Sequence, residues 1–127
     1  MRYYNDGLAS NPNNPDLLAG RGTALDILSR HTEAQASYQH ALAQRPYHTD
    51  AIHHDLAVSY IMTGKYDDAI IMLNKVEPKS KAIRKNLAVA NALNGNHKQS
   101  KKWRGNDLTT SALNSSIEFY RGYFKKL

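Results

Sequence analysis

Six histidines are the residues of this chain that invite a metal-binding interpretation. His53 and His54 are adjacent, so their side chains would diverge by about 100° on a helix. A zinc site on one helix face needs two histidines four residues apart, and no pair has that spacing. The sequence contains no cysteine, which excludes a thiolate metal site and a cysteine nucleophile. We therefore predict no metal site and no cofactor.

Motifs for enzymatic chemistry are missing as well. The sequence has no glycine-rich phosphate loop, no strand pattern that could carry a nucleophile elbow, and no pair of carboxylates in an evident pocket. The sequence therefore predicts a binding protein that is not an enzyme. One alternative stays open, which is that the chain is an accessory region of a larger enzyme such as a glycosyltransferase.

Charge is unevenly distributed along the chain. Residues 1–74 carry five Lys or Arg against eight Asp or Glu, whereas residues 75–127 carry twelve against three. The densest basic group, here called the basic cluster, consists of Lys98, Lys101, Lys102 and Arg104. It could attract an acidic protein, anionic lipid or nucleic acid, but a solvated helix face explains it more simply. Nucleic-acid binding is not expected, because no aromatic stacking platform or DNA-reading motif accompanies the charge.

Internal repeats indicate the elements that would position these side chains. A run of leucine, alanine and valine followed by glycine occurs twice, 31 residues apart: Leu56-Ala57-Val58 with Gly64, and Leu87-Ala88-Val89 with Gly95. A second set recurs after 34 residues: Tyr4, Gly7, Leu8 and Pro12, then Tyr38, Ala41, Leu42 and Pro46. Such periods are typical of solenoid proteins. Each unit is predicted to be a helix, a tight turn and a second helix.

Capping and glycine positions refine the first unit. Asn14 before Pro15 predicts the start of a helix that runs to about Leu28. Gly20 and Gly22 lie inside it and indicate close approach of a neighbouring helix, because glycine in a helix costs about 1 kcal/mol against alanine. The next helix is predicted from Thr32 to Gln44, with Thr32 opening a capping box.

These spacings resemble the tetratricopeptide repeat, a helical hairpin of 34 residues. The first unit matches through Gly22, Ala34, Tyr38, Ala41 and Pro46, and the second through Leu56, Ala57, Tyr60, Ala69 and Leu73. The third is degenerate, because Ser100 replaces an alanine and Arg104 replaces an aromatic residue. The resemblance implies an all-α right-handed superhelix. It would comprise a second helix left from a truncated preceding repeat (1–12), three repeats (14–47, 49–79 and 80–105) and a C-terminal capping helix (107–127).

The same resemblance implies a concave groove that is lined by the first helix of each repeat and binds a protein partner as a peptide or helix. The candidate groove residues are Thr23, Asp26, His54, Asp55, Val58, Met62, Lys85, Asn86 and Val89. Ile61 and Leu93 face the same way, although burial in the core explains them equally well. A clamp for a chain-terminal carboxylate is not expected, because the first repeat lacks the lysine and asparagine that form one.

The last helix is predicted to begin after Thr109 or Thr110. Its apolar residues are spaced 4, 3, 4 and 3 and form a stripe on one side: Leu113, Ile117, Tyr120, Phe124 and Leu127. We predict that this helix caps the exposed end of the stack, which a solenoid needs for solubility. The alternative is that it docks into another protein or folds back into the groove as an internal competitor.

The C-terminal part also resembles TadD-type proteins, the assembly factors of tight-adherence (Flp) pili. The resemblance rests on the run from Asn86 to Gly95, on Asp107-Leu108, and on a last helix with Ile117, Phe119, Tyr120 and Arg121. It implies a periplasmic, outer-membrane-associated lipoprotein that helps the pilus secretin to assemble. The chain looks truncated upstream of Met1, where a signal and a lipid anchor would lie, and that anchor would be its one link to a membrane. A cytoplasmic adaptor or export chaperone is the alternative.

Overall fold

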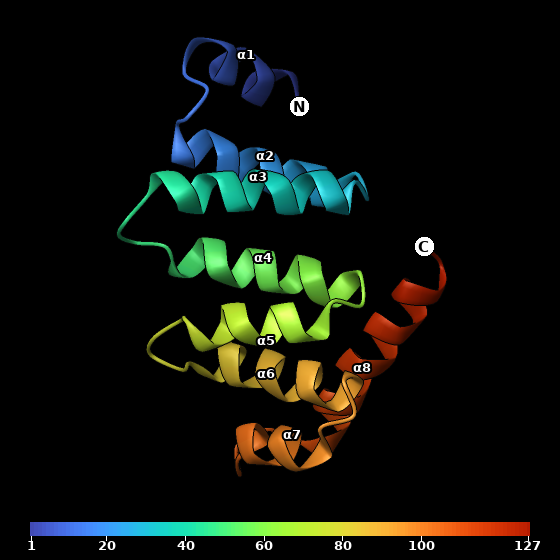
Figure 1. The fold of residues 1–127 in the computed structure, drawn as a ribbon. Coiled ribbons are helices and arrows are strands. Elements are labelled where there is room, and N and C mark those ends of the chain that lie inside the picture. The colour runs from blue at the N-terminus through green and yellow to red at the C-terminus, as the bar shows by residue number, and fades with distance from the viewer.

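The computed structural model describes residues 1–127 and contains eight helices and no strand. The helices are α1 (Arg2–Ser10), α2 (Pro15–Ile27), α3 (His31–Gln44), α4 (Asp50–Met62), α5 (Tyr66–Asn74), α6 (Lys81–Leu93), α7 (His97–Arg104) and α8 (Thr110–Lys125). The pairs α2/α3, α4/α5 and α6/α7 stack in chain order (Figure 1). The predicted all-α helical-repeat solenoid is confirmed.

Three helices begin at side chains that cap their free backbone N–H groups. The Asn14 side chain accepts a hydrogen bond from the Leu17 amide at 3.0 Å, and Pro15 takes the first helical position, as predicted. Ser80 caps α6 and Thr109 caps α8 in the same way. The capping box predicted at Thr32 is wrong, because α3 begins at His31 and has no side-chain cap.

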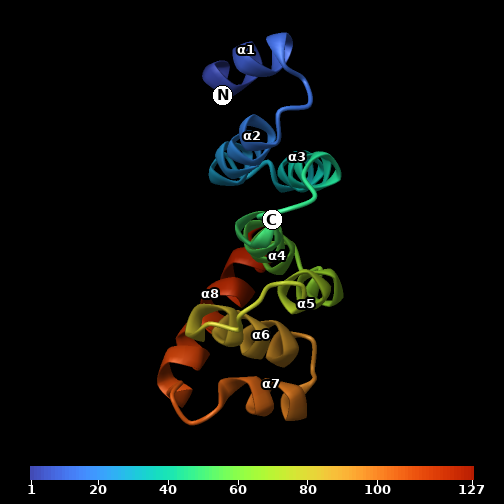
Figure 2. The ribbon, with the colours of Figure 1, turned by 90° about the vertical axis from the view of Figure 1, so that its left-hand side faces the viewer.

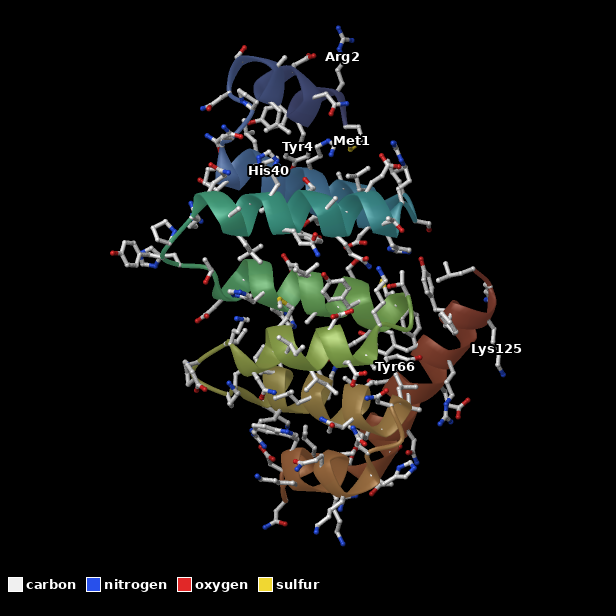
Figure 3. The ribbon with its side chains drawn as sticks, viewed as in Figure 1. Met1, Arg2, Tyr4, His40, Tyr66 and Lys125 are labelled. Carbon is white, nitrogen blue, oxygen red and sulfur yellow. The ribbon has the colours of Figure 1, made fainter.

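The glycines of α2 lie where aromatic rings approach the helix. A Cβ atom on Gly22 would lie 2.6 Å from Cε1 of Tyr38, a ring of α3 that is only 2% exposed. Gly20 faces the ring of Tyr4, which points from α1 toward α2 (Figure 3). The predicted close approach is therefore confirmed at both glycines.

The core runs the length of the stack. One cluster of 16 buried residues extends from Leu18 in α2 to Ala90 in α6. A second, smaller cluster of Ala88, Val89, Leu113 and Ile117 joins α6 to α8. Each fully buried leucine or isoleucine stabilises the fold by about 1.5–3 kcal/mol.

Buried polar side chains connect the helices beside this core. The Ser37 hydroxyl donates to the Leu18 carbonyl at 2.7 Å, and the Gln35 amide donates to the Thr63 hydroxyl at 3.0 Å. In the third repeat the buried Ser100 hydroxyl donates to the Ala88 carbonyl at 2.6 Å. Serine can thus replace the usual alanine at position 100, because its hydroxyl has a partner there.

The last helix lies beside the stack. Figure 2 shows α3 and α5 on one side, α2, α4 and α6 on the other, and α8 outside α4 and α6. α8 packs against α6 and α4, and its backbone does not approach that of α7 closely. Between the two placements that the sequence left open, the structure has the helix folded back onto the first helices of the repeats. It does not cover the outer side of α7.

Candidate functional site

The side of the stack formed by α2, α4 and α6, here called the inner face, holds a pocket of about 220 Å³ between α2 and α4. Seven residues line it: Thr23, Asp26, Ile27, Tyr38, Asp55, Val58 and Met62. Five of them were predicted as groove residues, because helical spacing places them on the same side of their helices. The structure therefore brings together more than half of the predicted groove residues at one place.

Asp26 lies at the edge of this pocket but is bound within the chain. Its Oδ1 accepts hydrogen bonds from Nδ1 of His31 at 2.7 Å and from the Ser59 hydroxyl at 2.8 Å. Its Oδ2 accepts from the Tyr38 hydroxyl at 3.1 Å. Since these donors come from α3 and α4, the carboxylate of α2 connects three helices. Asp26 was predicted to bind a partner, and the structure gives it a structural role as well.

The Asp26 carboxylate also connects the pocket to the last helix. A carboxylate only accepts hydrogen bonds, so the proton of His31 lies on Nδ1. Nε2 of His31 is hydrogen-bonded to the hydroxyl of Tyr123 in α8. The ring of Tyr123 packs edge-on against the imidazole, with centroids 5.5 Å apart. The chain of contacts from Asp26 through His31 to Tyr123 thus fastens the end of α8 to the first repeat.

Asp55 on α4 is the second carboxylate of the pocket. Its side chain makes no hydrogen bond or ion pair within the chain. Although it is exposed, the pocket walls partly desolvate it, and this desolvation raises its pKa. His54 lowers the pKa and Asp26 raises it, both by smaller amounts. Asp55 therefore carries a charge that the fold does not neutralise.

Three predicted groove residues lie further along the inner face. Nδ2 of Asn86 on α6 and Nε2 of His54 on α4 are 2.9 Å apart, and Asn86 is only 7% exposed. His54 borders a second, more open hollow beside the α5–α6 connection. Lys85 is half-buried and makes no ion pair. Asn86 and His54 thus satisfy each other, which leaves less of their hydrogen-bonding capacity for a partner.

Val89 was predicted to line an open groove, and this is wrong. It is fully buried beneath Leu113 and Ile117 of α8. Leu93 is partly covered by the same cluster, and Ile61 is fully buried in the main core. The inner face is therefore closed over the second half of α6 and open between α2 and α4.

The predicted basic cluster is only partly a free surface. Lys98, Lys101 and Lys102 are exposed on α7. Arg104 is half-buried, and its Nη1 donates to the Thr110 hydroxyl at 2.8 Å at the start of α8. Arg104 thus supports the α7–α8 connection, and the exposed part of the cluster is reduced to three lysines.

Sequence reasoning missed Ile27 and His31. Ile27 lines the pocket, and it occupies the position in its repeat that Met62 occupies in the next. The same spacing argument would therefore have found it. The role of His31 had no signal in the sequence, because its partners Asp26 and Tyr123 lie 5 and 92 residues away.

No cluster of three metal-ligating side chains occurs in the structure. None of the eight helices combines the length and the hydropathy that crossing a bilayer would require. The pocket holds hydrogen-bonding groups and apolar walls, which suits it to recognising a segment of another molecule.

A stack of helical hairpins with an open pocket on its inner face is the architecture of a binding scaffold. Residues 16–82, more than half of the chain, match the family model of the tetratricopeptide repeat. The chain belongs to the tetratricopeptide-repeat family, and it is a protein–protein interaction module. No curated protein matches its sequence.

Proposed function

We propose that this module acts without catalytic turnover and holds a segment of a partner protein on the open part of its inner face, anchored in the pocket between α2 and α4. The observation that carries the proposal is the convergence of Thr23, Asp26, Asp55, Val58 and Met62 on that pocket. Val58 and Met62 offer apolar contact, and Asp55 offers an acceptor that the fold leaves free. A partner segment needs both kinds of contact.

The partner we propose is the outer-membrane secretin of a tight-adherence pilus, and the location is the periplasm at the outer membrane. Support comes from the resemblance of the C-terminal half to TadD-type assembly factors, through Asn86 to Gly95, Asp107-Leu108 and the last helix. In this proposal the module holds secretin subunits during assembly. A membrane contact would come from a lipid anchor upstream of this chain.

Calorimetric titration of the full chain with segments of a tight-adherence secretin tests both proposals. We expect binding near micromolar, about −8 kcal/mol. Val58→Arg fills the pocket and should abolish binding, whereas Ile71→Arg on α5, where the isoleucine is 52% exposed, should leave it unchanged. Circular dichroism and thermal melting must show both variants folded.

The results separate the two levels of the proposal. Binding that both variants retain would show that the pocket is not the site. If no secretin segment binds to the folded wild-type chain, the secretin is not the partner, and the pocket would then be tested with an unbiased peptide library.

A further inference from the structure

The pocket between α2 and α4 combines two kinds of surface that few side chains match together. Ile27, Val58 and Met62 give it apolar walls, while Asp26 and Asp55 place carboxylates on its two sides. Asp26 is occupied by three donors of the fold, and Asp55 by none. An occupant must therefore present an apolar stem to the walls and a hydrogen-bond donor to Asp55.

The charge of the surrounding region favours a cation as that donor. Residues 1–74, which contain α2 to α5, carry more acidic than basic residues. No lysine or arginine of the chain forms an ion pair with Asp55 or Asp26. An incoming cation would therefore meet two carboxylates that no lysine or arginine of the chain pairs with.

We propose that the pocket binds an arginine or lysine side chain of the partner segment, with its aliphatic stem against Ile27, Val58 and Met62 and its cationic end on Asp55. This inference rests on the proposed function and names the chemistry of the partner. Arginine and lysine carry an apolar stem of three or four methylene groups that ends in a charge. The Asp26 carboxylate adds a second negative charge without giving up its own partners.

The rim of the pocket indicates what should flank the basic residue. Ile27 and Leu28 at the end of α2 are 79% and 53% exposed. The Ser29 hydroxyl lies 3.4 Å from the Tyr123 hydroxyl, which places the end of α8 beside this part of α2, and the half-exposed ring of Phe124 lies against Gly64 after α4. The partner segment is expected to carry a large apolar residue next to its arginine or lysine, because exposed apolar surface of this kind is buried favourably on binding.

The probe is a library of random dodecapeptides displayed on phage and selected on the full chain. We expect the selected peptides to share an arginine or lysine beside an apolar residue. A synthetic selected peptide is then compared with its citrulline analogue, which keeps the shape of arginine and removes the charge. Citrulline in the peptide should weaken binding about fivefold to tenfold, and so should Asp55→Asn in the chain. The two changes combined should weaken binding little more than either one alone, because both remove the same contact.

The matched control is Asp68→Asn, which removes one exposed carboxylate from α5 on the other side of the stack and should not change affinity. A peptide binds at the pocket if Val58→Arg abolishes its binding. If such a peptide keeps its affinity when its arginine is replaced by citrulline, this inference is overturned and the proposed function stands. Peptides that ignore Val58→Arg, or a selection that yields none, would overturn both.

The pH dependence gives a second readout. The titratable groups near Asp55 are His54 on its own helix, Asp26 of α2 and Tyr38 of α3, and partial burial of the Asp55 carboxyl group raises its pKa. Lowering the pH from about 7 to about 4 should therefore protonate Asp55 and progressively weaken the binding of the arginine-containing peptide. The citrulline peptide should show a smaller change. Equal pH profiles for the two peptides would contradict the assignment of Asp55 as the cation's partner.

Discussion

Replacing Asp26 with alanine should destabilise the fold more than any surface change on the inner face. The carboxylate accepts three hydrogen bonds, from His31, Ser59 and Tyr38, and these donors are 5%, 0% and 2% exposed. A hydrogen bond to a charged group contributes about 1.5–3 kcal/mol, and a buried donor left without a partner costs about 1–3 kcal/mol.

One of the three donors keeps another acceptor after the substitution. The Tyr38 hydroxyl still donates to the Thr23 hydroxyl at 3.3 Å, whereas the Ser59 hydroxyl only accepts from the Gln35 amide, at 3.2 Å. Nδ1 of His31 and the Ser59 hydroxyl therefore each lose the acceptor of their proton. We therefore expect Asp26→Ala to lower the free energy of unfolding by about 3–4 kcal/mol, which is near the lower end of what two such bonds would give at about 1.5–3 kcal/mol each.

Asp26→Asn is the matched comparison. The amide oxygen can take the place of Oδ1 and keep the hydrogen bonds from His31 and Ser59, so the expected loss is about 1 kcal/mol. Urea denaturation followed by circular dichroism measures both variants at neutral pH. A loss below about 1 kcal/mol for Asp26→Ala would refute the reasoning, because it would mean that the carboxylate does not hold the three helices together.

Three further changes test other parts of the structure. Gly22→Ala should lower the unfolding free energy by about 1–2 kcal/mol, because its methyl would press on a buried aromatic ring and outweigh the gain in helix propensity; a more stable variant in urea titration would contradict this. The pKa of Asp107 is lowered to about 2 by the hydrogen bond from Arg84, so a carboxyl NMR titration should find its midpoint there and Arg84→Gln should return it toward 3.8. Stability from this pair should be present above pH 3.8 and fall as the pH drops toward 2. Asp55→Asn should raise the melting temperature slightly at pH 7, because the raised pKa of Asp55 means that its charged form opposes folding, and the difference from wild type should vanish below pH 3.8.

The repeat architecture and most of the pocket could be predicted because they depend on periodicity. Once Leu56 and Gly64 were aligned with Leu87 and Gly95, the side of each first helix followed from the helical period. That side contains Val58 and Met62, which the structure places in one pocket. The packing at the glycines of α2 could also be predicted, because glycine has a low helix propensity and close approach of a neighbouring side chain is what offsets it.

The network around Asp26 could not be predicted, because its members are brought together by folding and not by spacing. Ser59 is 33 residues from Asp26 and lies on the next repeat. A polar residue on an otherwise apolar helix side indicates a partner, but the sequence does not say whether that partner is internal or external. Asn86 illustrates the same ambiguity, since its internal partner is His54.

The placement of α8 was undecided for a different reason. An apolar stripe spaced 4 and 3 fits any apolar surface of the right width, so the end of the stack and its inner face were both acceptable. The cluster around Val89 decides it, because Leu113 and Ile117 are buried there. The degenerate third repeat is consistent with this arrangement, since Arg104 donates to Thr110 at the start of α8.

The position of α8 also limits how a partner can approach. Leu113 and Ile117 are only 7% and 9% exposed, so lifting the first half of α8 would give up about 3–6 kcal/mol of apolar burial. A partner that needed the whole inner face would have to recover that amount before gaining affinity. A segment that enters between α2 and α4 meets no such obstacle, because the pocket there is already open. Binding at the open pocket is therefore favoured over displacement of α8, and Asp55 is the free charge that such a segment meets.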